Sequence, residues 1–95
     1  MKKYEVMYIL KADLDEAARK AEIEKLHNIL ESTGGKVSTV NEWGLRDFAY
    51  EINYMTKGYY VVIKVETNEE ALREFRRLTK IDQNVVRHLI TVDQD

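Results

Sequence analysis

The side chains that most often perform catalysis are few in this 95-residue chain, and they are scattered along it. There are two histidines, His27 and His88, and no cysteine, which excludes a thiolate nucleophile, a disulfide and a cysteine metal site. The two serines, Ser32 and Ser38, lie in no nucleophile-elbow motif. The Gly34-Gly35 pair precedes a predicted strand, so we expect it to end a helix rather than to cradle a phosphate. These residues argue against an enzyme and against a bound metal or other cofactor.

The two histidines have different expected surroundings. His27 lies in a predicted helix between Leu26 and Asn28, where we expect a solvated surface side chain. His88 is in phase with Ile90 of a predicted strand, which indicates a hydrogen-bonded histidine at the edge of the core. A ligand contact is the alternative for His88, and the phase does not decide which face of the sheet it takes.

Basic side chains are the second candidate for chemistry, because clustered lysines and arginines neutralise nucleic-acid phosphates. Lys2, Lys3 and Arg87 lie on the predicted first and last strands, and we expect those strands to be neighbours that bring the three charges to one region of a sheet. A net charge of −2 argues against a protein that coats nucleic acid without specificity, and it is compatible with a local basic patch. A second basic group is expected to be a solvated helix face that complements the helix dipole, and it consists of Arg73, Arg76, Arg77 and Lys80.

The elements that must position these residues follow from the periodicity of the apolar side chains. In chain order we predict a strand over 2–10, a helix from about 13–16 to 32, strands over 36–52 and 58–66, a helix from about 68 to 80, and a strand over 85–92. Two β-α-β units with right-handed crossovers interleave into a ferredoxin-like α+β sandwich, a four-stranded antiparallel sheet with both helices on one face. We expect residues 1–95 to form a single domain.

Local signals refine this prediction at the hairpin and at the helices. The apolar spacing slips by one residue between Leu45 and Phe48, which predicts a bulge near Gly44 to Asp47, and residues 53–58 carry turn chemistry. Thr67 and Glu70 predict a capping box for the second helix, with Asn68 as the alternative cap. The first helix is expected to turn one stripe toward the core, formed by Ile23, Leu26 and Leu30 and supported by Ala18 and Ile29.

Helices on one side only leave the other face of the sheet uncovered. The phasing of the strands places apolar side chains on that face: Met7, Ile9, Tyr60, Val62 and Leu89. Both homodimerisation and the docking of a specific protein partner would bury them. A homodimer would also offer a pocket for a small ligand between the sheets, lined by Met7, Tyr60 and Val62.

The sequence also bears on where the protein works. No apolar run approaches the roughly 20 residues of a membrane span, and the Met1-Lys2-Lys3 start leads into a mixed strand instead of a signal-peptide core. We therefore expect a cytoplasmic protein that does not associate with a membrane.

Four stretches of the chain resemble one known family. They are MKKYEVMYIL at Met1–Leu10, WGLRDFAYEI at Trp43–Ile52, KGYY at Lys57–Tyr60 and NVVRH at Asn84–His88. Together they resemble the bacterial small-subunit ribosomal protein six family along essentially the whole chain. The opening decapeptide combined with the W-G-x-R-x-x-A-Y-x-I run is specific to that family.

This resemblance implies a non-enzymatic protein of the ribosome, monomeric when isolated, that binds the central domain of small-subunit rRNA. The implied partner is small-subunit ribosomal protein eighteen, seated against the sheet and the long hairpin. By position, Lys2, Lys3 and Arg87 match basic residues that face RNA in the family, with Arg46 and Lys57 as further candidates. A basic partner would neutralise most phosphates, so the slightly acidic charge of this chain fits the implication. The alternative from another class is a homodimeric ferredoxin-like module that binds a small ligand.

Overall fold

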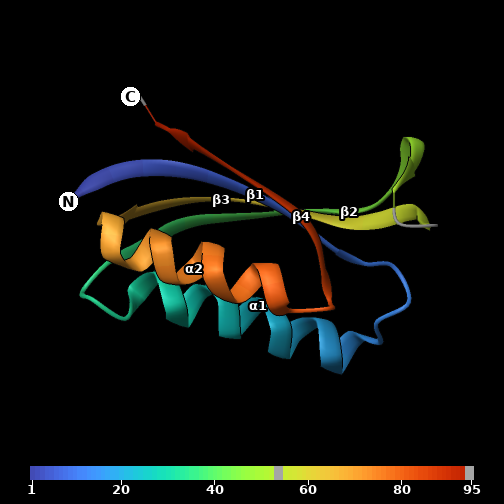
Figure 1. The fold of residues 1–95 in the computed structure, drawn as a ribbon, viewed down its shortest axis with the longest axis horizontal. Coiled ribbons are helices and arrows are strands. Elements are labelled where there is room, and N and C mark those ends of the chain that lie inside the picture. The colour runs from blue at the N-terminus through green and yellow to red at the C-terminus, as the bar shows by residue number, and fades with distance from the viewer. Residues whose placement is uncertain (53–54, 94–95) are drawn as a thin grey trace.

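The predicted order of elements is confirmed by the computed structural model, which describes residues 1–52 and 55–93. Figure 1 shows α1 and α2 side by side beneath one face of the sheet, while the opposite face carries no helix. The fold is the predicted ferredoxin-like sandwich. Its elements are β1 (Lys2–Lys11), α1 (Glu16–Glu31), β2 (Lys36–Ile52), β3 (Met55–Thr67), α2 (Glu69–Ile81) and β4 (Val85–Val92).

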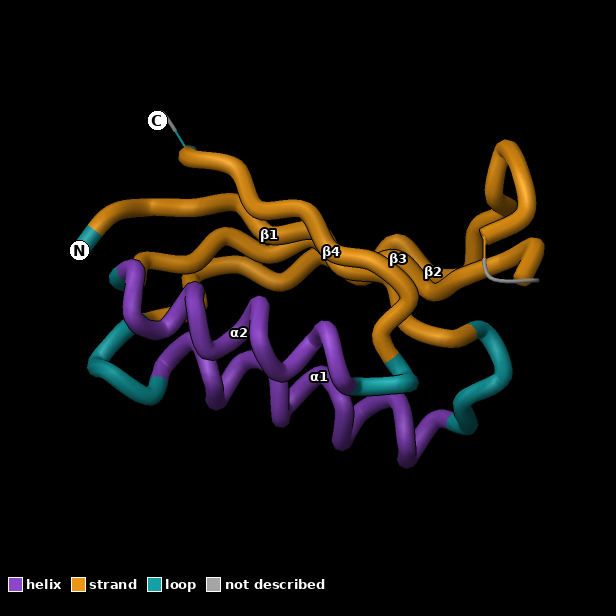
Figure 2. The backbone as a smooth tube through the Cα atoms, viewed as in Figure 1, coloured by secondary structure: helices purple, strands orange, loops and turns teal. Residues whose placement is uncertain are grey.

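The sheet is antiparallel, and its strand order is β2-β3-β1-β4. β1 therefore lies in the centre, where Met7 is opposite Val62 of β3 on one side and Leu89 of β4 on the other. The start of β1 and the end of β4 lie at one end of the sheet, and the β2–β3 hairpin projects from the other end (Figure 2). We call the helix-free side of the sheet the open face.

The core lies between the sheet and the two helices. Alternation along β1 places every second side chain against the helices, as predicted. Each fully buried large apolar side chain contributes about 1.5–3 kcal/mol relative to an exposed one. The largest buried members of this core are Tyr8, Phe75, Leu10, Leu26, Leu30, Ile63 and Leu72.

Both helices begin at a side-chain cap. Asp15 accepts a hydrogen bond from the Ala18 amide at 2.7 Å, and Asn68 accepts one from the Ala71 amide at 3.0 Å. Asn68 was the alternative cap, and the predicted capping box through Thr67 is wrong. The Thr67 hydroxyl is buried and instead donates to the carbonyl of Leu30 at 2.8 Å, which ties β3 to the end of α1.

The buried stripe of α1 contains Leu26 and Leu30 as predicted, with Ile23 packed at its side, but it begins at Glu22. Ala18 is exposed, so its expected support of the core is wrong. The stripe follows the four-residue spacing of Glu22, Leu26 and Leu30, all buried, with Ile29 packed at its side. Glu22 thus brings a carboxyl group into the position expected for an apolar residue.

The β2–β3 hairpin departs from the prediction in two ways. β3 begins at Met55, so the part of the predicted turn from Met55 to Gly58 is strand, while residues 53–54 lie outside the described residues. The strand register shifts between Glu42 and Gly44 and again after Asp47, at either end of the predicted bulge. Between these shifts the pairing is regular, and Gly44 has the left-handed φ of 85° that glycine tolerates.

Candidate RNA and protein interfaces

The five apolar residues predicted for the open face lie next to one another there. Met7 is opposite both Val62 and Leu89, and Ile9 is opposite Tyr60. Leu89 is 55% exposed, and Met7, Tyr60 and Val62 are half-buried. Ile9 is only 3% exposed, so the chain itself already covers it. Four of the five side chains therefore remain within reach of a partner.

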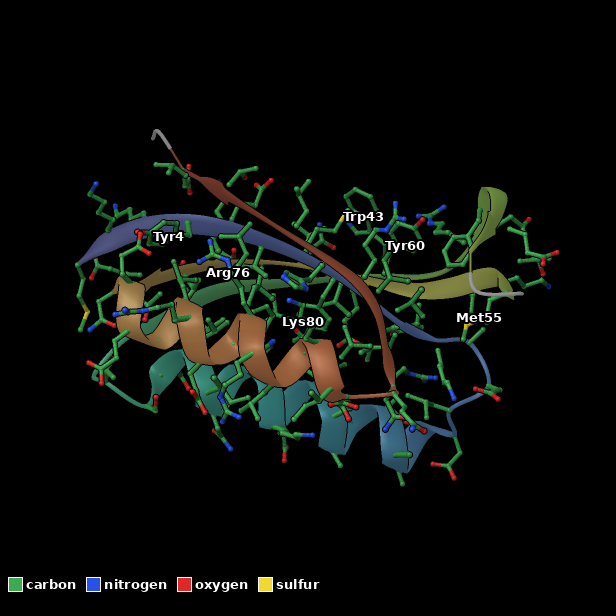
Figure 3. All side chains as sticks on the ribbon, viewed as in Figure 1. Tyr4, Trp43, Met55, Tyr60, Arg76 and Lys80 are labelled. Carbon is green, nitrogen blue, oxygen red and sulfur yellow. The ribbon has the colours of Figure 1, made fainter. Side chains whose placement is uncertain are left out.

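Aromatic rings from the hairpin cover part of this face, and two of them, Trp43 and Phe48, were not predicted to lie there. The Trp43 ring stacks on Tyr60 with the ring centroids 6.2 Å apart, and Phe48 lies tilted against Tyr60 at 6.3 Å. A Cβ at Gly58 would collide with Ile9 and come within 2.8 Å of the Phe48 ring, which shows how closely these residues pack. Figure 3 shows Trp43 and Tyr60 together on the side of the sheet away from the helices.

The register shift explains how Trp43 reaches the open face. Asn41 is opposite Val62 on that face, Glu42 is opposite Val61, and Gly44 is already opposite Tyr60. Trp43 is the extra residue of the bulge, and a bulge redirects the side chain it carries. The slip in apolar spacing was the available signal, but it pointed a few residues too far along the chain.

The three leading basic candidates do not share one region, so that prediction is wrong. Antiparallel pairing places the start of β1 against the end of β4, with Tyr4 opposite Val92. Arg87 is opposite Ile9, six residues along β1 from Lys3, which corresponds to roughly 20 Å. Lys2 and Lys3 therefore mark one end of the sheet, and Arg87 belongs to the other end.

The remaining two candidates lie at the hairpin end of the sheet. Arg46 is opposite Gly58, whose other strand neighbour is Lys11, and Lys57 is opposite Asp47. Arg46 and Lys57 are both exposed, as Arg87 is. The structure thus groups Arg46 and Lys57 with the Arg87 end of the sheet rather than with Lys2 and Lys3.

The end of the open face that carries Lys3 has mixed charge. A shallow depression of about 330 Å³ there is lined by Lys3, Lys36, Ser38, Lys64, Val65, Glu66 and Asp93. The Lys64 ammonium lies 3.7 Å from the Asp93 carboxylate. Acids therefore offset part of the positive charge beside Lys3.

Both histidines lie between the sheet and the helices, and one of the two predictions is wrong. His27 is half-buried, and its Nε2 lies 2.9 Å from the hydroxyl of fully buried Tyr8, so it is not a solvated surface histidine. Burial lowers the pKa of His27. His88 is the predicted core-edge histidine: its ring stands edge-on to Phe75, and its Nδ1 lies 3.2 Å from the Thr79 hydroxyl.

A carboxyl cluster at the α2–β4 turn was not predicted. Glu22 Oε1 accepts a hydrogen bond from the Asn84 amide at 3.2 Å, while Oε2 is buried and has no hydrogen-bond partner among the described residues. Lys25 lies 2.9 Å from Asp82 and 4.0 Å from Glu22. Burial and the neighbouring Asp82 raise the pKa of Glu22. The cluster fastens α1 to the turn that begins β4.

Two further searches of the described residues bear on function. Within residues 1–52 and 55–93, no group of three histidine, aspartate or glutamate side chains is arranged to hold a metal ion. No helix in the described part of the chain has the length and apolar character needed to cross a membrane.

Comparison with known proteins gives a consistent result. Residues 3–91 match the sequence profile of the family described as ribosomal protein S6. A relative from Halalkalibacterium halodurans, the small ribosomal subunit protein bS6, is 46% identical over 95 residues, which cover all of both chains. The crystal structure of 30S ribosomal protein S6 from Thermotoga maritima superimposes with a TM-score of 0.90 at 28% identity, covering 97% of this chain and 87% of the other.

Proposed function

This chain belongs to the ribosomal protein S6 family, and from that premise we propose that it binds central-domain small-subunit rRNA jointly with small-subunit ribosomal protein eighteen. The family is that of a small ribosomal subunit protein, so its place is the ribosome and its role is structural rather than catalytic. One observation carries the proposal: the open face has an apolar centre and basic side chains toward both of its ends.

The apolar centre is the proposed seat of the protein partner. Leu89, with Met7, Tyr60 and Val62, offers a contiguous surface, and Trp43 extends it toward the hairpin at 45% exposure. Aromatic and methionine side chains are enriched at the centres of protein interfaces, and charged residues are depleted there. In this proposal the isolated chain is a monomer, because a different protein, and not a second copy of the chain, covers its apolar face.

The basic side chains at the two ends of the sheet are the proposed RNA contacts. Lys2 and Lys3 serve one end, and Arg46, Lys57 and Arg87 serve the other. Since these groups lie about 20 Å apart, as estimated from the strand rise, they would reach phosphates on two separate RNA segments. A few contacts from each end are sufficient when a basic partner supplies further phosphate neutralisation.

The proposal is tested by titrating a central-domain rRNA fragment with this protein, with the partner protein, and with both at fixed salt, in a gel-shift assay. We expect tight binding only by the pair, weakened at least tenfold by Lys3→Glu or Arg87→Glu. Lys20→Glu, an equal charge reversal on exposed α1, is the matched control and should leave binding unchanged.

Two results would contradict the proposal. One is that this chain has no effect on RNA binding by the partner. The other is a stable homodimer in solution, measured by sedimentation, because it would place a second copy on the open face and favour the small-ligand alternative.

A further inference from the structure

The flank formed by α2 and β4 carries a group of basic side chains. Arg73, Arg76, Arg77 and Lys80 follow one another at spacings of three, one and three residues, and all four are exposed. This spacing forms a stripe along one side of a helix, next to the buried face that carries Leu72 and Phe75. Figure 3 shows Arg76 and Lys80 on the side of α2 that faces β4.

No acid lines the depression along this stripe. Its volume is about 450 Å³, and its lining consists of Arg73, Arg76, Arg77, Lys80 and His88. Glu74 is the acid nearest in sequence, and it pairs with Arg77, which it meets at an exposed site. Arg73, Arg76 and Lys80 therefore present their charge to whatever lies in the depression. This concentration contrasts with the net charge of −2 for the whole chain.

His88 forms part of the same lining, and its hydrogen bonds fix its role. The single proton of the Thr79 hydroxyl is directed to the carbonyl of Phe75 at 2.8 Å and that of Arg76 at 3.1 Å. Thr79 Oγ1 therefore accepts from His88 Nδ1, so Nδ1 carries the ring proton and Nε2 is the acceptor. A ring held in this way can accept a hydrogen bond from a hydroxyl group such as a ribose 2′-OH.

The stripe is continuous with Arg87, one of the proposed RNA contacts. A second depression, of about 380 Å³, shares Lys80 and His88 with the first. Its other lining residues are Thr79, Val85, Val86 and Arg87. The basic surface therefore runs from Arg87 across the β4 edge and along α2.

We propose that this α2–β4 flank binds the sugar-phosphate backbone of the same rRNA and extends the contact that begins at Arg87. This inference rests on the proposed function. The stripe from Arg73 to Lys80 spans about 10 Å at the helical rise of 1.5 Å per residue, which is the length of about three phosphates along one strand. Guanidinium groups suit this task because they bind phosphate oxygens in a bidentate manner.

The chemistry of the flank favours RNA over an acidic protein. The centres of protein interfaces are depleted in charged residues and enriched in aromatic ones. The lining of this depression has the opposite composition, four cationic side chains and one histidine. Contacts to phosphate and sugar make up half or more of the hydrogen bonds in protein–DNA complexes and come mainly from such side chains.

The test uses the full chain, the partner protein and a central-domain rRNA fragment. Arg73→Gln/Arg76→Gln removes two charges, and Arg73→Lys/Arg76→Lys keeps them at the same two helix positions as the matched control. We expect the glutamine pair to weaken RNA binding by the protein pair about tenfold and to reduce the slope of log K against log salt by about 1.5, for two lost phosphate contacts. The lysine pair should keep nearly the full slope. Thermal unfolding of each variant confirms that the fold is intact.

The outcomes separate this inference from the proposed function. If the wild-type chain binds RNA with the partner and Arg87→Glu weakens binding, but the glutamine pair binds with an unchanged salt slope, the α2–β4 inference is overturned alone. If the glutamine pair instead weakens association of the two proteins without RNA, the flank contacts protein, which also overturns it. If the wild-type chain has no effect on the partner's RNA binding, the proposed function itself fails.

Discussion

The hydroxyl of Tyr8 and Nε2 of His27 lie 2.9 Å apart and join the central strand to α1. Tyr8 is fully buried, and burial strongly raises its pKa, so its phenol remains protonated. A buried hydroxyl proton needs an acceptor, and among the described residues His27 Nε2 is the group within hydrogen-bond distance, so the phenol donates this bond. His27 must accept through Nε2 and therefore carries its proton on Nδ1. The pair is a polar connection between the sheet and α1 inside a mainly apolar core.

Removing the Tyr8 hydroxyl should destabilise the fold. In Tyr8→Phe the acceptor on half-buried His27 loses its partner, which costs about 1–3 kcal/mol of unfolding free energy. Urea unfolding followed by circular dichroism measures this loss. Tyr60→Phe is the control, because it removes a hydroxyl from the open face and should lower the unfolding free energy by less than about 0.5 kcal/mol. Equal losses in both variants would show that the Tyr8–His27 bond contributes nothing specific.

Acidification should weaken the fold through His27. Burial lowers its pKa, and the opposing influence of Glu31 and Glu42 is smaller. The neutral ring therefore contributes stability that is fully present above the unfolded pKa of about 6.5 and is lost as the pH falls through the folded value. We expect His27→Gln to flatten the fall in unfolding free energy between pH 7 and pH 5. Burial also lowers the pKa of His88. In His27→Gln the unfolding free energy should therefore still fall between pH 7 and pH 5, but by less than in the wild type. An unchanged slope in His27→Gln would contradict this assignment.

The pH dependence of stability contributed by Glu22 should be opposite to that of His27. Burial and Asp82 raise its pKa, so the protonated carboxyl contributes stability at low pH that is lost as the pH rises through the folded value. Glu22→Gln should raise the melting temperature at pH 7 by a few degrees, because the amide keeps the bond to Asn84 without ionising. Differential scanning calorimetry at pH 7 checks this, with Glu24→Gln on the exposed face of α1 as control. A lower melting temperature would mean that the ion pair with Lys25 dominates.

Replacing either of two glycines with alanine should destabilise the fold, for a different reason at each position. Gly58→Ala forces a Cβ against Ile9 and Phe48, which should cost about 1–3 kcal/mol through overpacking. Gly44→Ala meets no atom within 4 Å but keeps a φ of 85°, so we expect a loss of about 1 kcal/mol from backbone strain. Phe48→Ala should reduce the additional loss caused by Gly58→Ala, as a double-mutant cycle by urea unfolding would show.

The fluorescence of Trp43 should change when a protein partner binds. It is the single tryptophan of the chain, it stacks on Tyr60, and it is 45% exposed. Docking against the open face and hairpin would remove it from water and shift its fluorescence emission to shorter wavelength. The measurement uses a partner that lacks tryptophan, and Trp43→Phe is the control for background emission. An unchanged spectrum on complex formation would place the partner elsewhere.

Periodicity alone predicted most of the fold because local pattern and tertiary structure agree along this chain. The strands over 36–52 and 85–92 have the predicted bounds, and α1 and α2 end within a residue or two of theirs. The errors lie where tertiary contact overrides local pattern. Ala18 is exposed while Glu22 is buried, because the α2–β4 turn supplies Asn84 as a polar partner for the carboxyl group.

The candidate sites were predictable by strand and face, but not by position along the strand. Alternation placed Met7, Val62 and Leu89 on one face correctly, since side-chain direction has a period of two. Alternation alone could not reveal that Lys3 and Arg87 lie at opposite ends, although the antiparallel pairing of the first and last strands implies it. Nor could it place Trp43, since a bulge shifts every later residue by one.

The register shift between Glu42 and Gly44 also has a protective effect. β2 is an outer strand of the sheet, 17 residues long, with Val40 and Leu45 about half exposed. A long, flat outer strand invites edge-to-edge aggregation, since its unpaired amides and carbonyls form a template for another chain. The bulge interrupts that template near the middle of the strand. The irregularity that turns Trp43 toward the open face thus also hinders edge-to-edge self-association.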